Sequence, residues 1–365
     1  MTPEDQQKLE EYCQGIAAIL YRNAEAKNAE QLKTLEGIEL AVREQMLENV
    51  SPKIGVFFVE TSSGTKAGKE RHLKSCIGDL TITSKQAKQL NVRARTQLSP
   101  HMEKCCLLTS GNESYARAMK NVKELTGIVV SHSTQQRLVQ RYNFPQVELA
   151  ETVEEMSLDG GKVRLRTAKG KKSEWKDYKS VTLQGKAVIA YFQENQALVE
   201  RVQQQELAEI VSCLGDGHDG IWNLFSQIAP VEQRFEILDW YHLVEHLHGV
   251  GGSMRRLENA EQFLWNGDVE SAIALFEGCK FKRAVNFVDY LRNHCLRIPE
   301  YSYFHKLGLT IGSGSVESSI KQIGRRIKIS GAQWNRKNVS QVLKHRCAYL
   351  NDMLDSCEYN YSVPN

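Results

Sequence analysis

The chain lacks the cysteine pattern of a disulfide-stabilised or zinc-ribbon protein. Its nine cysteines are widely spaced, apart from the neighbours Cys105 and Cys106, and none of them forms a Cys-x-x-Cys pair. An odd number of scattered cysteines in a chain of 365 residues indicates reduced thiols. The sequence therefore argues against a secreted, disulfide-rich domain and against a zinc ribbon.

Long apolar runs and a strong net charge are also missing. Because no run reaches about 20 apolar residues, we expect no membrane-spanning helix. The first residues, MTPEDQQKLEEYCQG, are polar and acidic, unlike a signal peptide, so we expect a cytoplasmic protein. The net charge of +3 is too small to identify a partner, and only the distribution of charge is informative.

The first part of the chain predicts helices followed by a short β-hairpin. Apolar residues recur every three or four positions over residues 1–50, which is typical of helix. The apolar run at 53–60 predicts a strand, and 64–70 predicts a flexible loop. The segment LKSCIGDLTITS predicts a hairpin around Gly78 and Asp79.

A helical pattern resumes at Ser99 and contains a candidate DNA-binding element. Two short helices are joined by the loop TGIVVSHS, and the second opens with Ser and Thr capping residues. This pattern is compatible with a helix-turn-helix and equally with a plain helical hairpin.

The central region predicts an α/β fold. Three strands are expected between residues 153 and 193, followed by a helix (QALVERVQQQELAEI), a strand (IVSCLGDG), a helix (GIWNLFSQI), a strand (RFEILDW) and one long helix over 241–264. Strands followed by alternating strands and helices indicate an α/β core. Residues 258–305 are predicted to be wholly helical.

Three acids are candidates for a catalytic metal site. Asp159 and Asp216 are expected at strand ends, each before a glycine, and Glu317 is expected in the first turn of a helix. Phosphodiester cleavage suits two Mg²⁺ ions about 4 Å apart, and Mg²⁺ prefers oxygen ligands. Taken singly, an Asp before Gly is typical of a turn and a Glu at a helix start favours the helix dipole. Their order and placement together favour catalysis.

Two basic segments predict a nucleic-acid partner. The segment KVRLRTAKGKKSEWKDYK carries eight Lys or Arg and two acids, and residues 321–346 carry eight more with no acid. Such segments bind phosphates, although a charge run is often only a solvated face. The candidate DNA-binding residues are Arg325, Arg326, Lys328, Trp334, Lys171 and Lys172.

Several motifs together resemble the insertion-sequence transposases of the ISKra family, which are related to Mutator-like DDE transposases. The motifs are SLDGGKVRLR, CLGDGHDGIWNLF, LDWYHLVEHLH and SGSVESSIKQIGRRIKISGAQWN, and the resemblance covers about residues 97–350. It implies an RNase H-like (retroviral-integrase-like) core with a helical insertion and the catalytic acids Asp159, Asp216 and Glu317, which hold two Mg²⁺ or Mn²⁺ ions.

The resemblance also implies roles for three further residues and for partners. The D-x-x-H element of Mutator-like transposases falls on Asp239 and His242, and Trp334 matches the tryptophan after the basic helix. The partners implied are the terminal inverted repeats and target DNA, held by a homodimer or larger assembly in the bacterial cytosol. Many relatives carry upstream cysteine pairs that resemble a zinc-binding element, but the corresponding region here holds only Cys76. This departure is compatible with recognition of DNA ends without zinc or with loss of part of that function.

These patterns divide the chain into six regions. We expect an N-terminal helical and hairpin region (1–95), a helical DNA-binding region (96–148), the first part of the core (149–257), a helical insertion (258–306), the glutamate helix with a basic segment (307–352) and a tail (353–365).

Three alternatives stay open. Asp239, which also ends an apolar strand, competes with Asp216 as the second metal ligand, and Asp219 is a further substitute. His242, Glu245 and His246 spell H-x-x-E-H, the zinc motif of inverted metallopeptidases. The chain is also compatible with a domesticated DNA-binding protein that has no catalytic activity.

Overall fold

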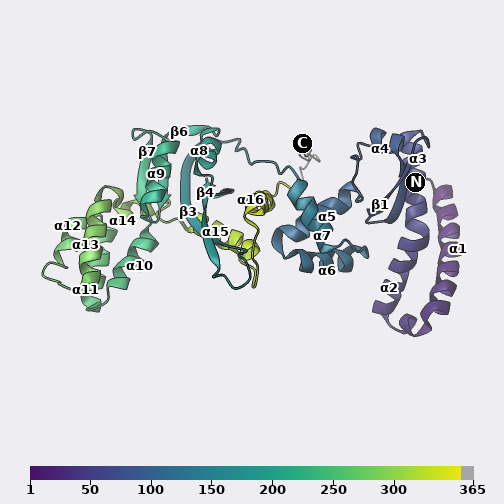
Figure 1. Cartoon of the computed structure of the whole chain (residues 1–365), viewed down its shortest axis with the longest axis horizontal. Helices are drawn as coiled ribbons and strands as arrows, with labels where there is room; N and C mark the ends of the chain where they lie inside the picture. The colour runs from purple at the N-terminus through teal and green to yellow at the C-terminus, as the bar shows by residue number, and fades with distance from the viewer. Residues whose placement is uncertain (355–365) are drawn as a thin grey trace. The chain divides into compact units, whose positions relative to one another are not determined.

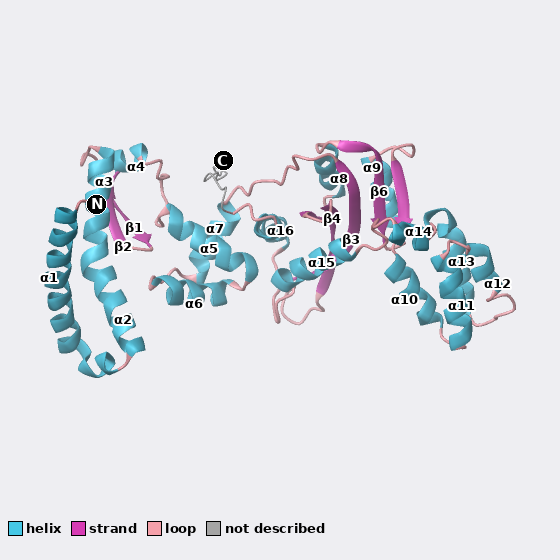
Figure 2. Ribbon diagram, turned by 180° about the vertical axis from the view of Figure 1, so that it is seen from behind, coloured by secondary structure: helices cyan, strands magenta, loops and turns pink. Residues whose placement is uncertain are grey.

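The computed structural model describes residues 1–354, which form two compact units. The first contains Met1–Ser110 and Ser114–Leu138, and the second contains Gly111–Glu113 and the chain from Val139 onward. Figures 1 and 2 show the elements of both units. No helix within residues 1–354 is long and apolar enough to cross a membrane. Most of the predicted tail, residues 355–365, lies outside the described residues.

The first unit begins with helices, as predicted for residues 1–50. They are α1 (Pro3–Asn28), the 3₁₀ turn η1 (Ala29–Lys33), α2 (Leu35–Gln45) and the π-helical turn η2 (Met46–Val50). The hydroxyls of Thr2 and Thr34 accept backbone N–H groups at the starts of α1 and α2, which satisfies donors that a helix cannot pair internally.

The strand predicted for residues 53–60 is wrong, because this segment is part of helix α3 (Ser51–Ser63). Pro52 occupies the first turn, where its missing N–H does no harm, and Gly64 ends the helix in the left-handed conformation at φ 60°. A short apolar run does not by itself distinguish a strand from a helix, so these end signals decide the structure.

The predicted hairpin is confirmed as β1 (Glu70–Ser75) and β2 (Gly78–Thr83), which pair antiparallel. Four helices follow, namely α4 (Ser84–Gln89), α5 (Pro100–Asn112), α6 (Tyr115–Thr126) and α7 (His132–Arg141). Gly127 ends α6 in the left-handed conformation, and the Ser131 hydroxyl accepts the Thr134 N–H at 3.2 Å to start α7. The predicted pair of helices is thus confirmed.

A five-stranded mixed sheet forms the centre of the second unit. Its strands are β3 (Val153–Leu165), β4 (Glu174–Leu183), β5 (Ala187–Phe192), β6 (Leu207–Gly215) and β7 (Arg234–Leu238). They lie in the order β5-β4-β3-β6-β7. The pairs β3–β4 and β4–β5 are antiparallel, whereas β6 and β7 extend the sheet parallel to β3. The predicted α/β character of this region is confirmed.

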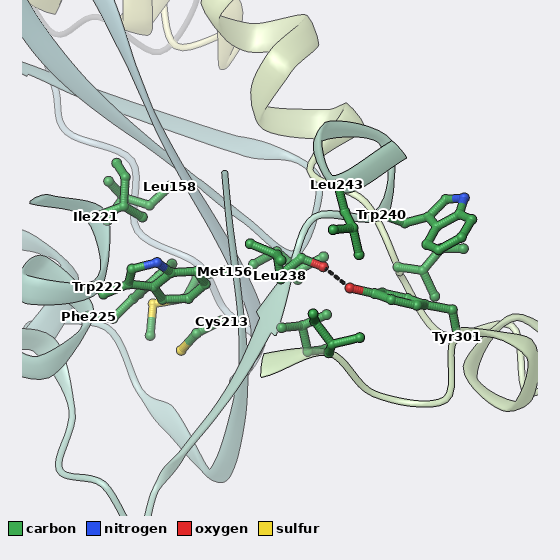
Figure 3. Packing of buried hydrophobic residues seen from close by; sticks show 14 of the residues in the cluster. Met156, Leu158, Cys213, Ile221, Trp222, Phe225, Leu238, Trp240, Leu243 and Tyr301 are labelled. Carbon is green, nitrogen blue, oxygen red and sulfur yellow. Dashed lines mark hydrogen bonds between the residues drawn. The ribbon is translucent and has the colours of Figure 1, made fainter. Parts of the chain in front are cut away.

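Helices cover both faces of this sheet. Helices α8 (Asn195–Gln203) and α9 (Asp219–Ile228) pack on one face around buried residues such as Leu158 and Phe225 (Figure 3). Helices α15 (Gly314–Ile327) and α16 (Arg336–Leu350) pack on the other, against Val163 and Tyr178. Helix α8 ends at Gln203, earlier than predicted, because the chain turns into β6.

A helical segment separates β7 from α15. It consists of α10 (Trp240–Val250), α11 (Met254–Trp265), α12 (Val269–Ala274), α13 (Lys282–His294), the turn η3 (Cys295–Arg297) and α14 (Tyr301–Lys306). The single helix predicted over 241–264 is wrong, because Gly251 and Gly252 adopt φ 74° and 97° and separate α10 from α11. Residues 258–305 are likewise interrupted by loops.

Asp159 lies in the middle of β3, so its predicted placement at a strand end is wrong. Gly160 and Gly161 do not turn but pair with Lys179 and Tyr178 of β4. A Cβ at Gly161 would lie 2.2 Å from Cζ of the buried Tyr178 ring. The second glycine therefore provides room for this ring against the strand.

We expect Gly161→Ala to destabilise the second unit by about 1–3 kcal/mol, because the methyl group overpacks against Tyr178. Gly249→Ala is the matched control. Gly249 lies inside α10, and a Cβ added there would meet nothing within 4 Å, so this change should stabilise by about 0.5–1 kcal/mol. Thermal unfolding followed by circular dichroism checks both, and an unchanged midpoint for Gly161→Ala would contradict the packing argument.

Candidate functional site

Three aspartates lie in one row across three neighbouring parallel strands. Leu158 of β3 pairs with Gly215 of β6, and Gly215 pairs with Leu238 of β7. The residue that follows each of these three positions in the sequence is an aspartate, namely Asp159, Asp216 and Asp239. Because neighbouring strands are about 4.8 Å apart, the register brings the three carboxylates to the same level of the sheet.

Asp159 is partly buried and close to other charges. Its Oδ1 accepts the Gly160 N–H at 2.5 Å. Burial raises the pKa of Asp159 and the neighbouring Asp216 raises it further, whereas the Gly160 N–H, His242 and Lys179 lower it. A carboxylate that is desolvated beside a second carboxylate favours a bound cation.

Asp216 directly follows β6, as predicted. Its Oδ1 accepts the His218 N–H at 2.9 Å, and its main-chain carbonyl accepts the Tyr290 hydroxyl at 3.4 Å. Gly217 has φ 90°, and a Cβ there would lie 2.5 Å from the Tyr290 oxygen. Within residues 1–354, Oδ2 of Asp216 and of Asp159 accept no hydrogen bond, so each carboxylate keeps one oxygen for another ligand.

Asp239, by contrast, uses both carboxylate oxygens within the fold. Oδ1 accepts the His242 N–H at 2.7 Å and caps α10, while Oδ2 accepts the N–H and the hydroxyl of Ser313. The His242 ring nitrogen Nδ1 also lies 3.2 Å from Oδ1. Burial raises the pKa of Asp239, but the hydrogen bonds from His242 and Ser313 outweigh it, so the net pKa is lowered.

Glu317 lies in the first turn of α15, as predicted. Its N–H donates to the Ser313 carbonyl at 2.8 Å, so it is one helical turn from the contact between Ser313 and Asp239. The α15 helix packs on the sheet, where the Thr182 hydroxyl donates to Ser319 Oγ at 3.2 Å. The Glu317 side chain is 45% exposed and pairs with Lys321 at 2.6 Å. The described acids do not form a set of three with ligand atoms within 4.8 Å.

The H-x-x-E-H residues make other contacts. His242 faces Asp239, and the His246 ring stacks on Tyr290 with 4.7 Å between centroids. Glu245 and His246 line an open pocket of about 540 Å³ that also contains Arg283. No group of three metal-ligating residues includes His242, Glu245 or His246 in the described part of the chain, so the geometry does not favour a zinc peptidase.

The candidate DNA-binding residues divide into exposed and structural ones. Arg325, Lys328, Lys171 and Lys172 are exposed, the two lysines in the loop between β3 and β4. Arg326 is only 1% exposed, and its guanidinium lies 5.1 Å from the centre of the Trp334 ring. We correct the prediction for Arg326, because a buried side chain cannot reach a phosphate.

Trp334 is also held by the fold. Its indole N–H donates to the Ile327 carbonyl at 2.8 Å, and its backbone pairs with β3 through Arg164 and Arg166. Its contacts join the end of α15 to the sheet, so the structure gives it a packing role.

Sequence reasoning missed two residues of the site. Ser313 connects α15 to Asp239, and Tyr290 of α13 covers the Asp216 backbone. Ser313 belongs to the GSGS segment, whose small polar residues were a usable signal. Nothing in the sequence around Tyr290 indicates its contact with a residue 74 positions earlier.

Comparison with known proteins adds no family assignment. No protein-family model matches the chain, and no curated protein is similar enough to count as a relative.

The ion pair between His242 and Asp239 should make stability depend on pH. The Asp239 carboxylate, which accepts from the protonated His242 ring, raises the pKa of His242 to about 9. Since this lies above the ordinary value of 6.5, the pair stabilises the fold fully below pH 6.5, and the stabilisation is lost as pH rises through about 9. We expect His242→Asn to remove this decline in urea unfolding between pH 6.5 and 9. The control is His132→Asn on α7, and an equal decline in His242→Asn and wild type would contradict the assignment.

Proposed function

We propose that the chain is a DDE-type DNA transposase that cleaves DNA at insertion-sequence ends and joins the freed ends to target DNA. The observation that carries this proposal is the row of Asp159, Asp216 and Asp239 across adjacent strands, with the Glu317 helix attached to it through Ser313. Three acids from separate parts of the chain thereby lie at one level of the sheet, and the fourth, Glu317, begins the helix attached beside them.

The sheet topology supports an RNase H-like core. Three antiparallel strands, β3 to β5, continue on the other side of β3 into the parallel strands β6 and β7. The first acid lies within the central strand and the second directly after its parallel neighbour. The helices α11 to α14 lie between β7 and α15, where the resemblance implies an insertion.

The hydrogen bonds favour Asp216 over Asp239 as the second metal ligand. Both Asp239 oxygens are engaged by His242 and Ser313, whereas Asp159 and Asp216 each keep Oδ2 open within the described residues. We assign metal binding to Asp159, Asp216 and Glu317. Asp239 and His242 are positioning residues that hold the start of α15.

The donor set fits two Mg²⁺ or Mn²⁺ ions. All three assigned groups are carboxylates, and the raised pKa of Asp159 reflects burial and repulsion from Asp216, which a cation relieves. Glu317 is partly exposed and pairs with Lys321, and we propose that its side chain turns toward the aspartates when the ions bind. When bound, such ions activate the attacking oxygen and stabilise the leaving oxygen.

The protein's part in the proposed reaction is to position the DNA and the acids. Water first breaks the phosphodiester bond at the element end and leaves a 3′-hydroxyl. This hydroxyl then attacks a target phosphodiester, forming one bond as another breaks. Asp159 and Asp216 stay at their sheet positions in both steps. Because two ends must be joined, we propose a dimer or larger assembly, acting in the bacterial cytosol.

Cleavage assays with matched variants test the proposal. The substrate is a set of labelled duplexes from both flanks of the encoding gene, incubated with Mg²⁺ or Mn²⁺. We expect Asp159→Asn, Asp216→Asn and Glu317→Gln each to lower the cleavage rate at least about 100-fold, because each removes one metal ligand. Asp289→Asn, a change at an exposed acid of α13, should cleave at the wild-type rate.

Two other outcomes would overturn parts of the proposal. If Asp216→Asn cleaves at the wild-type rate while Asp239→Asn is folded but inactive, Asp239 is the second metal ligand. Wild-type protein that binds the duplexes but never cleaves them would support the non-catalytic DNA-binding protein instead.

Exposed basic residues near α15 are proposed to contact phosphates. Arg325 is on the exposed side of α15 and Lys328 follows its end, while Lys171 and Lys172 lie in the β3–β4 loop. The proposed interface therefore uses Arg325, Lys328, Lys171 and Lys172, and excludes the buried Arg326.

Removing two of these charges should weaken the salt dependence of binding. For the double variant Arg325→Gln with Lys328→Gln, we expect a shallower slope of log binding constant against log salt concentration. The slope should become less negative by about 1.8, or about 0.9 for each phosphate that the protein no longer neutralises. The control pair is Arg292→Gln with Lys8→Gln, which removes equal charge at exposed positions elsewhere. Fluorescence anisotropy measures both slopes, and equal slopes for the two double variants would exclude this interface.

A further inference from the structure

Three metal-ligating side chains from separate elements meet in the first unit. Ligand atoms of Cys76, His101 and Cys105 all lie within 4.8 Å of one another. Cys76 lies in the turn between β1 and β2, and His101 and Cys105 are on α5. These two are four residues apart, so they face the same side of the helix, toward the hairpin turn.

The backbone holds these ligands in place without a metal. The Ser99 N–H donates to the Lys74 carbonyl at 2.9 Å, and the Lys74 N–H donates to the Gln97 carbonyl at the same distance. The Ser99 hydroxyl also accepts the Met102 N–H at 3.3 Å at the start of α5. The end of β1, two residues before Cys76, is therefore fixed to the residues that precede α5.

The sulfur spacing fits a tetrahedral metal ion. Cys76 Sγ and Cys105 Sγ are 3.9 Å apart. Two Zn–S bonds of about 2.3 Å at a tetrahedral angle place their sulfurs about 3.8 Å apart. A disulfide would need about 2.05 Å. The three ligand atoms lie within 4.8 Å of one another, at most about 1 Å farther apart than ligand atoms around one zinc ion. The exposed His101 ring can close this difference by side-chain rotation.

We propose that Cys76, His101 and Cys105 bind one Zn²⁺ ion. Two thiolates and an imidazole are a soft donor set that selects zinc over Mg²⁺. On binding, the two thiols release their protons to solvent, and no oxidant or reductant takes part. Three protein ligands leave a fourth position for water, since the cluster is only partly buried. The ion joins the β1–β2 hairpin to α5.

The site is separate from the proposed catalysis and from a zinc ribbon. Its ligands include no Cys-x-x-Cys pair, and two of the three come from a helix that follows the hairpin by 17 residues or more. The catalytic acids are oxygen donors in the other unit. A spectroscopic signal specific to sulfur therefore distinguishes the two kinds of metal site.

Cobalt binding to the full chain tests the proposal. The protein is stripped with a chelator and titrated with Co²⁺ under a non-thiol reductant. We expect about one equivalent to give a thiolate-to-cobalt charge-transfer band with tetrahedral visible bands, both displaced by Zn²⁺. Cys76→Ser and Cys105→Ser should abolish the charge-transfer band or halve it, and His101→Ala should weaken affinity at least about tenfold.

Matched controls separate this result from non-specific binding or misfolding. Cys13→Ser and Cys295→Ser, at exposed cysteines outside the cluster, and Asp159→Asn should all keep the wild-type band. His101 is exposed, so His101→Ala tests the ligand set even where a cysteine variant fails to fold. Absence of the band in wild-type protein, or wild-type affinity in His101→Ala and Cys105→Ser, would overturn the proposal.

Discussion

The second unit depends on one buried carboxylate, that of Asp239. The side chain is 2% exposed, and an unpaired charge in such a position would cost several kcal/mol. Donors from His242 and Ser313 satisfy it. They come from α10, which precedes the helical insertion, and from the residue before α15, which follows it. The neighbouring backbone adds two contacts, from Trp240 N–H to the Ile311 carbonyl and from the Tyr301 hydroxyl to the Leu238 carbonyl. A residue that resembles a metal ligand in sequence therefore serves to place the Glu317 helix beside the sheet.

In the candidate site, two neighbouring carboxylates repel one another, and only a few positively charged side chains offset this repulsion. Asp159 and Asp216 raise one another's electrostatic energy in a partly buried place, and His242 and Lys179 offset this only in part. The two proposed metal ions would offset the remaining repulsion. The second glycine after Asp159 serves packing, because Gly161 admits the Tyr178 ring on the face of the sheet that α15 and α16 cover. A candidate site residue and a core-packing residue are therefore two positions apart on the same strand.

Much of the local secondary structure follows from the sequence, whereas the burial of individual side chains does not. Capping residues such as Thr34 and Ser131, and glycines such as Gly64 and Gly127, mark helix ends that are readable in a linear chain. The error at residues 53–60 arose because a short apolar run suits either a strand or a helix. The error at Arg326 arose because a basic residue on a helix carries no sign of whether it faces solvent or the core.

By itself, the sequence determined most helices and strands and the order of the three acids, because hydrophobic period, caps and turn residues act over a few positions. The tertiary structure alone decided which acids keep an open oxygen and which basic residues reach solvent. It also decided that Cys76 meets two ligands on α5, about 25 residues away. The register between strands, which aligns Leu158, Gly215 and Leu238, depends on contacts between segments far apart in the sequence. The packing between distant helices depends on such contacts as well, and no local sequence pattern predicts them. The chemistry of the chain therefore becomes specific only when separate elements bring their side chains together.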